Sequence, residues 1–412
     1  MSASAPASAR TPTRAAFGFI FATALMNAVS FGVVLPVLPN LIKAFAHGDT
    51  SLAAQWSTVF SVAWGAMQFV CGPALGALSD RIGRRPVLLI SLCGLAFDFF
   101  VMALAPNLVW LLAGRIVNGM TSASFATANA YIADVTAPGD RARAFGRIGA
   151  ALSLGFLAGP VVGGMLASID LRMPFYVAGF VTALNALFGI FVLPESLPPE
   201  RRASGLDPRE LNPFAAFALL REHGDLLVLC VLGALFAFAW MVGPSVFVLY
   251  GGYRYGWAAA AIGVVMMASG GIGAIVQTAL VGPAVARLGE HGAALLGAVA
   301  AAIGYAAFGL AGTGWAYLAV IPVFALHNVF TPALQGLLTR HVDEGGQARL
   351  QGLVQATQGI ASVVGPLVFG IVFAWSTRAG TGPALSGSPF FLASAIMLVV
   401  SLGLIALRNA AR

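Results

Sequence analysis

Charge is concentrated at a few places in a chain that otherwise avoids it. Residues 76–85 read GALSDRIGRR, so that Asp80, Arg81, Arg84 and Arg85 fall within six positions, although only 9% of the chain is charged. Basic residues alone would anchor a loop at a membrane surface, and an anchor requires neither Asp80 nor the glycine spacing. The segment therefore predicts a role beyond that of a topology anchor, which stays the alternative.

Asp98 is the one acid that lies deep within an apolar run. It falls about a dozen residues into that run, roughly 18 Å at 1.5 Å per residue, which places it near the middle of a bilayer. An ionised carboxylate there costs roughly 2.5–3.5 kcal/mol, and protonation removes that cost. Proton coupling requires such a site, so Asp98 is the candidate proton carrier. The alternative is a structural hydrogen bond to a neighbouring helix.

Arg115 is the only strongly basic residue within an apolar run. Its guanidinium stays protonated, so it must meet a carboxylate, a carbonyl, water or an anionic substrate group. The alternative is a side chain that extends to the membrane surface.

The composition identifies a membrane protein. The chain has 412 residues, of which 59% are hydrophobic, and a soluble domain carries about 25% charged residues. The apolar runs are continuous and rich in Ala, Leu and Gly, which favours helices over the alternating strands of a membrane barrel. The net charge of +7 is explained by basic loops, so we expect no nucleic-acid partner. No cluster of His, Asp or Glu and no phosphate-binding motif indicates an enzyme, a metal site or a cofactor.

Twelve spans account for the apolar runs. We predict helices at 15–43, 52–78, 86–105, 107–135, 141–168, 173–193, 225–249, 257–287, 291–312, 314–339, 348–376 and 387–408. An even number of spans puts both termini on one side. The loops and tails of that side hold seventeen basic residues against four on the other, so that side is cytoplasmic. We therefore expect a multi-pass protein of the inner membrane.

The halves of the chain echo each other. GALSDRIGRR at 76–85 aligns with GPAVARLGEH at 282–291, and the same offset of 206 places Gly159-Pro160 on Gly365-Pro366. Two matches at one offset predict a duplicated six-helix unit. We expect a disordered tail at 1–14, a first bundle at 15–193, a cytoplasmic linker at 194–224 and a second bundle at 225–412.

These motifs resemble those of the major facilitator superfamily, and more narrowly the tetracycline-efflux branch of the drug:proton antiporters. The loop signature G-x-L-x-D-R-x-G-R-R is matched by Gly76, Leu78, Asp80, Arg81, Gly83, Arg84 and Arg85. The fourth-helix motif is matched by Arg115, Gly119 and residues 131–134, which include Asp134. The antiporter signature of the fifth helix is matched by Gly155, Gly159, Pro160, Gly163 and Gly164.

The resemblance implies a fold of two six-helix halves and a proton-coupled exporter of drug-like amphipathic compounds. It implies a cytoplasmic gate in which Asp80 and Arg84 join Asp134 and Arg141. It also implies proton coupling through Asp98 and Arg115, driven by the proton gradient without a cofactor. We expect a monomer in the lipid bilayer that exchanges protons for a small-molecule substrate. The alternative is a transporter of a metabolite, not specific for drugs, without obligatory proton antiport.

The chain departs from the branch inside the membrane. Asn27 and Ala301 stand where tetracycline exporters have acids, and Gly273 stands where they have a histidine. Losing two acids removes charge that would attract a drug–cation chelate, so we expect weak or absent tetracycline transport with divalent cations. The candidate substrate contacts are Asn27, Asp98, Asn118, Trp240, His327 and Gln358.

Overall fold

Long helices form almost all of the chain for which the structure gives positions. This computed structural model describes residues 14–122, 124–136, 141–202, 224–340, 347–378 and 383–410, and no strand occurs in these ranges. The predicted tail at 1–14, except Arg14, and residues 203–223 of the predicted linker lie outside the described residues.

The helices of the first half are α1 (Arg14–Phe45), α2 (Thr50–Ile82), α3 (Arg84–Leu104), α4 (Leu108–Thr121), α5 (Ser124–Val135), α6 (Arg141–Ile169), α7 (Met173–Val192) and the short 3₁₀ helix η2 (Pro199–Arg201). Those of the second half are α8 (Gly224–Trp240), α9 (Val242–Tyr255), α10 (Ala259–Ala279), α11 (Val281–Leu310), α12 (Gly314–Ala325), α13 (Phe330–Thr339), α14 (Gln347–Ser376) and α15 (Ser388–Ala410), with 3₁₀ segments η4 (Leu326–Val329) and η6 (Pro383–Gly387). Among the described residues, eleven helical stretches are long and apolar enough to cross a membrane, and α4 is a shorter apolar helix. The prediction of an all-α membrane fold is confirmed.

Four of the predicted spans are interrupted, although the sequence reading treats each as one helix. The eighth, predicted at 257–287, divides into α10 and α11 at Leu280. The fourth divides into α4 and α5 at Ser122, whose ψ of 73° is not helical. The seventh divides at Met241, and Pro244 follows closely; the tenth passes through η4, and Pro332 follows it. A proline lacks the N–H that would bond back to the fourth preceding residue, so Pro244 and Pro332 weaken the helix in the seventh and tenth spans.

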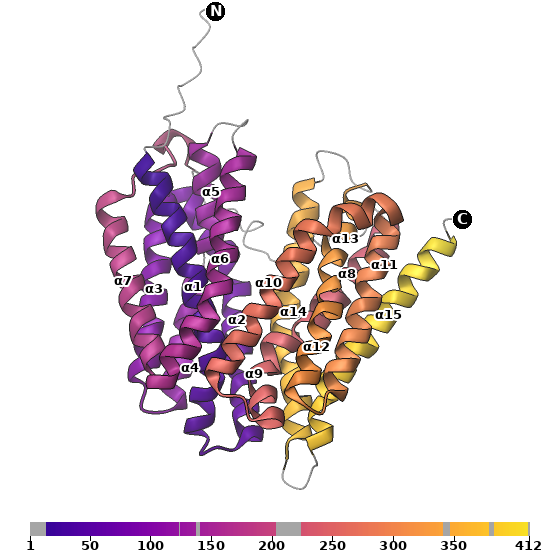
Figure 1. The fold of residues 1–412 in the computed structure, drawn as a ribbon. Coiled ribbons are helices and arrows are strands. Elements are labelled where there is room, and N and C mark those ends of the chain that lie inside the picture. Colours follow the sequence, from indigo (N-terminus) through magenta and orange to yellow (C-terminus); the bar gives the residue numbers. More distant parts are fainter. Residues whose placement is uncertain are drawn as a thin grey trace, which may run out of the picture.

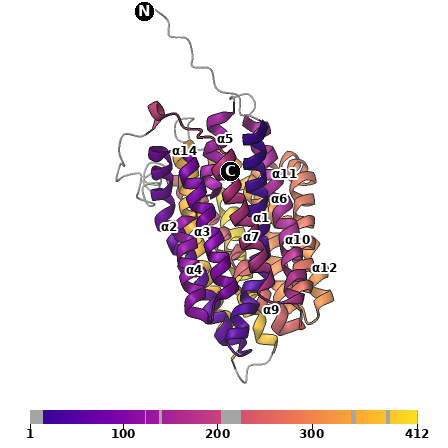
Figure 2. The same cartoon turned by 90° about the vertical axis from the view of Figure 1, so that its left-hand side faces the viewer.

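The two halves form two bundles that lie side by side, with α1–α7 in one and α8–α15 in the other (Figure 1). The start of α1 and the end of α15 lie toward the same end of the molecule, which we call the terminal end. The other is the distal end. In both views α6 lies beside α10, and α2 lies beside α14 (Figures 1 and 2).

Close approaches between the bundles begin at the distal end and continue along α2 and α14 as far as Phe69 and Gly359. The Ser51 hydroxyl on α2 donates a hydrogen bond of 2.7 Å to the Ala374 carbonyl on α14. On α6, a Cβ added to Gly164 would lie 2.6 Å from the carbonyl oxygen of Ala259, at the start of α10. The ribbons diverge toward the terminal end (Figure 1). The structure is therefore a state in which the bundles meet at the distal end.

Candidate functional site

Asp98 and Arg115 form a buried ion pair between α3 and α4. The Arg115 guanidinium donates from Nη2 to Asp98 Oδ2 and, at 3.3 Å, from Nε to Oδ1, so both carboxylate oxygens are engaged. Asp98 is 0% exposed and Arg115 is 9% exposed. Two-point contact of this kind fixes the orientation of both side chains. The structure thus brings into direct contact the two residues to which the resemblance assigns proton coupling.

The local sequence brings these two helices together. Asn107 caps α4, because its Oδ1 accepts hydrogen bonds from the backbone N–H groups of Val109 and Trp110 at 3.1 and 3.2 Å. Gly114 then faces the acid, since a Cβ there would lie only 2.8 Å from Asp98 Oδ1. Sequence reasoning missed Gly114, although it directly precedes the buried arginine.

Asp98 lies deeper toward the distal end than the sequence reading places it. It is the fifteenth of the 21 residues of α3, which puts it roughly 21 Å from Arg84 and roughly 9 Å from Leu104 at 1.5 Å per residue. The difference arises because α3 begins at Arg84 and the turn at 105–107 follows directly.

The loop signature at the terminal end places one arginine between two acids. Arg84 contacts Asp80 Oδ1 at 2.5 Å through Nη1 and Asp134 Oδ2 at 3.1 Å through Nε. The predicted cluster thus includes these three residues. The side chain of Arg141 lies outside the described residues, and Arg81 is exposed. A Cβ on Gly76 would meet nothing within 4 Å, so close packing does not require that glycine.

Glu195, which sequence reasoning missed, caps α3 from the start of the linker. Its carboxylate accepts hydrogen bonds from the backbone N–H groups of Arg84 at 2.8 Å and Arg85 at 3.3 Å. Gly83 sits beneath it with a φ of 108°, and an added Cβ would overlap the carboxylate. Arg85 turns away from the two acids, because its Nη2 donates to the Ile190 carbonyl on α7 at 2.5 Å. Glu195 belongs to the stretch LPES at 193–196, where the predicted linker begins.

The second half carries a charge-inverted counterpart of this cluster. The offset of 206 maps Arg84 to Glu290 and Asp134 to Arg340, and Arg340 Nε lies 2.9 Å from Glu290 Oε2. The helix also turns at Gly289, whose φ of 70° and ψ of 169° resemble the φ of 108° and ψ of 163° at Gly83. The aligned sequences contained this signal, but the repeat was read only through its glycines and one arginine.

The glycines of α6 pack against two different helices, α1 and α10. A Cβ on Gly155, Gly159 or Gly163 would lie 2.5–2.6 Å from atoms of α1, so these three permit close packing inside the first bundle. Gly164 instead faces α10 in the second bundle, and the Pro160 carbonyl lies against Gly263 of the same helix. The predicted motif therefore combines a packing face with a contact between bundles.

One of the predicted substrate residues, Asn118, lies at the edge of a group of aromatic side chains. The Trp64 indole donates to the Asn118 amide oxygen at 2.7 Å, and the Phe31 ring lies 6.1 Å from Trp64 and 5.7 Å from Phe156. At 100° per residue, Phe156 points between the α6 face that packs on α1 and the face at Gly164 that meets α10. It therefore points into the protein rather than toward lipid, and yet it is 42% exposed.

The remaining candidates are separate from this cluster or buried. Asn27 is buried on α1, whereas Trp240 and Gln358 are exposed on α8 and α14. His327 stacks between Phe236 and Phe324, and its Nδ1 lies 2.7 Å from the Phe324 carbonyl.

Two of the departures from the tetracycline-efflux pattern occupy tight positions. Ala301 is 1% exposed, and a Cβ on Gly273 would lie 3.1 Å from the Asn328 amide nitrogen. Asn328 thus occupies space near the position where the branch has a histidine.

Comparison with known proteins places the chain in a family. A model of the Major Facilitator Superfamily matches residues 20–366. The chain is 39% identical to the class C tetracycline resistance protein of Escherichia coli, over 90% of this chain and 93% of that protein. It is 35% identical to the class G tetracycline resistance protein of Vibrio anguillarum, over 87% of this chain and 90% of that protein.

Solved structures with this fold include the human organic anion transporter MFSD10, with a TM-score of 0.68 and 23% identity over 96% of this chain and 100% of that chain. They also include the nucleoside transporter NupG, with a TM-score of 0.76 and 16% identity over 96% of this chain and 99% of that chain. The matched residues and the shared two-bundle fold together show that this chain belongs to the major facilitator superfamily.

Proposed function

We propose that this chain is a proton-coupled exporter that moves drug-like amphipathic compounds by alternating access of its two bundles. The observation that carries the proposal is the buried Asp98–Arg115 pair, a titratable group inside a membrane bundle. Relatives named as tetracycline resistance proteins, which align along nearly the whole chain, support it. No observation favours the metabolite transporter.

The terminal end faces the cytoplasm in this proposal. The excess of basic residues in the loops and tails of that side, seventeen against four, supports this orientation in the inner membrane. The distal contacts then close the protein toward the periplasm, and the structure represents its inward-facing state. Both bundles belong to one chain, so a monomer contains the whole transport path.

The proton acts on the contact between α3 and α4. When a proton binds an oxygen of Asp98, the carboxyl group becomes neutral, while Arg115 stays charged. The attraction between the two side chains is lost, and the guanidinium gains by moving to another acceptor. Proton binding thus changes which helix arrangement is stable, which is the coupling that antiport requires.

The substrate binds near Phe31, Trp64 and Phe156. Their rings, inclined by 42° between Phe31 and Trp64 and by 82° between Phe31 and Phe156, give an apolar aromatic surface, and Asn118 adds a polar group at its edge. Asn27 and Ala301 add no charge, and Asp98 is already paired. This environment suits an amphipathic compound without a bound divalent cation.

Everted membrane vesicles test the proposal. A respiration-driven pH gradient is followed with a quenched acridine dye, and tetracycline, ethidium and norfloxacin are added in turn. We expect at least one compound to collapse the gradient in vesicles that contain the chain. Vesicles without the chain and vesicles with Asp98→Asn should show no collapse. If no compound from a broader drug panel does so with folded protein, the proposal is wrong.

A further inference from the structure

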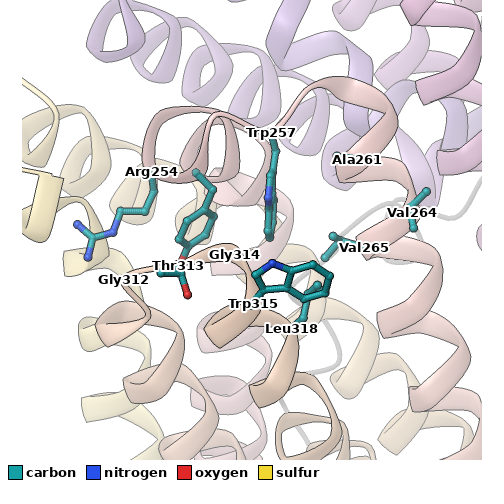
Figure 3. Close-up of a pocket in the computed structure, with 11 residues that line it drawn as sticks. Arg254, Trp257, Ala261, Val264, Val265, Gly312, Thr313, Gly314, Trp315 and Leu318 are labelled. Atoms are coloured by element: carbon teal, nitrogen blue, oxygen red, sulfur yellow. The ribbon is translucent and has the colours of Figure 1, made fainter.

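A cavity of about 650 Å³ lies at the distal end of the second bundle, and none of the candidate substrate, proton-coupling or gate residues named above lines it. It is formed by the segment that joins α9 to α10, by the first turns of α10, and by the loop before α12 together with its first turns. Figure 3 shows Trp257 and Trp315 on two sides of it, with Arg254 and Thr313 toward one side and Val264 toward the other. The volume is in the range of small-molecule sites.

The mouth of this cavity faces outward from the bundle. Trp315 is 82% exposed and Val264 is 52% exposed, and both lie on helices that belong to apolar, membrane-length stretches. In a membrane protein, such exposed apolar side chains contact lipid. Tryptophan and tyrosine near the ends of spans lie at the level of the lipid headgroups. The cavity is therefore accessible from the membrane at headgroup depth.

The lining of the cavity combines apolar and polar side chains, and its charge is positive. Arg254 is the charged residue among the eleven that line it, and none of the eleven is acidic. Arg254 is held at the rim, because its Nε donates to the Ala311 carbonyl at 3.4 Å, an acceptor that it shares with the Tyr255 hydroxyl at 2.9 Å. That bond engages one of the five donors of a guanidinium, a group suited to phosphate oxygens. The opposite side offers Val264 and Leu318 to an acyl chain.

We propose that this cavity binds one anionic phospholipid of the outer leaflet. The phosphate lies near Arg254 and Thr313, the glycerol part lies between Trp257 and Trp315, and an acyl chain leaves past Val264. The assignment to the outer leaflet rests on the orientation in the proposed function; the lipid site itself does not depend on transport.

Because the cavity lies next to the contact between the bundles, a bound lipid affects the state in which the distal end is closed. Ala261 lines the cavity, and the two residues before it, Ala259 and Ala260, are those against which Gly164 of the first bundle packs. A lipid seated there supports the start of α10 from behind the contact between the bundles. Binding thus favours the arrangement in which the distal end is closed.

Native mass spectrometry tests the site without any transport measurement. The full chain, purified in a non-ionic detergent, is incubated with equal amounts of dioleoyl phosphatidylglycerol and dioleoyl phosphatidylcholine. We expect one phosphatidylglycerol to be retained per chain, with at least a fivefold preference over phosphatidylcholine. Equal retention of the two lipids by the unmodified chain would overturn the proposal.

Variants locate the lipid. Arg254→Gln should lower retention of phosphatidylglycerol at least fivefold, and Arg254→Lys should restore part of it. Trp315→Ala should lower retention of both lipids. Arg378→Gln, an exposed arginine at the end of α14 outside the cavity, is the matched control and should change nothing. Retention by Arg254→Gln equal to that of the unmodified chain, at the same elution volume, would place the lipid elsewhere.

Discussion

Arg115 on α4 engages both carboxylate oxygens of Asp98 on α3, and the pair is closed off from solvent. Removing one member of a buried pair leaves the other charge without compensation, which costs about 3–5 kcal/mol, whereas removing both members can be neutral. We therefore expect Asp98→Asn to lower thermal stability strongly and to abolish uphill export driven by a pH gradient. Asp98→Asn with Arg115→Gln should recover stability without recovering uphill export.

Unfolding in detergent and substrate flux in proteoliposomes measure the two effects separately. If the single and double variants unfold at the same temperature, the pair does not stabilise the fold. If Asp98→Asn still drives uphill transport, the proton travels by another route.

The height at which Asp98 and Arg115 meet could be read from the sequence. Asp98 lies seven residues before Ala105 and Arg115 lies eight after Asn107, so a tight turn between them puts both at one level. Whether the side chains face each other depends on how the two helices are rotated, and that is set by packing such as the close approach at Gly114.

The number of spans followed from hydrophobicity alone. The breaks at Ser122 and Met241 did not, because a long apolar run hides them.

At the terminal end, too, the repeat in the sequence predicts local features but not contacts between distant segments. The offset of 206 aligns Gly83 with Gly289, and both have a positive φ, a backbone conformation that favours glycine. The pair of Glu290 with Arg340 requires two loops to be adjacent in space, and the charge inversion hid its relation to Arg84 and Asp134.

Asp80→Asn tests the gate at the terminal end. The contact of Asp80 with Arg84 is half exposed, since the Asp80 side chain is 51% accessible, and exposed pairs contribute about 0–1 kcal/mol. We therefore expect little change in unfolding temperature, but transport at least tenfold slower, because the acid is needed when the terminal end closes. Normal transport by well-expressed Asp80→Asn would leave membrane topology as the only role of the loop.

An exchange of charges tests the counterpart in the second half. Glu290→Arg alone replaces the acid that Arg340 Nε contacts at 2.9 Å with a second positive charge, so the attraction becomes repulsion and transport should fall at least fivefold. Glu290→Arg combined with Arg340→Glu restores opposite charges and should recover most of the rate. The measurement is export rate per folded transporter. A double variant as slow as the single one would show that the pairing itself is not what matters.

Tetracycline transport tests the substrate environment. Asn27 and Ala301 supply no negative charge, and Asp98 is paired, so the transport path has little to attract a chelated cation. We expect uptake of tetracycline into everted vesicles to be weak and unchanged by Mg²⁺. Robust uptake stimulated by Mg²⁺ would contradict this and would show that one acid suffices. Asn27→Asp is the matched variant, and it should increase the response to Mg²⁺.

Gly164→Ala tests how the bundles close at the distal end, with Gly76→Ala as its control. A methyl group at Gly164 would lie 2.6 Å from the Ala259 carbonyl, which is backbone of the other bundle and cannot rotate away. Overpacking of this kind costs about 1–3 kcal/mol, and here the bundles can relieve it by separating. Gly76 belongs to the loop signature at 76–85, but its surroundings are open. Its substitution should therefore leave the equilibrium between closed and separated bundles unchanged. Spin labels at Leu52 on α2 and Trp375 on α14, both exposed, report the distance across the closed end. We expect Gly164→Ala to shift the distance distribution toward longer values and Gly76→Ala to match the unmodified chain. An unchanged distribution in Gly164→Ala would mean that the contact with α10 does not hold the distal end closed.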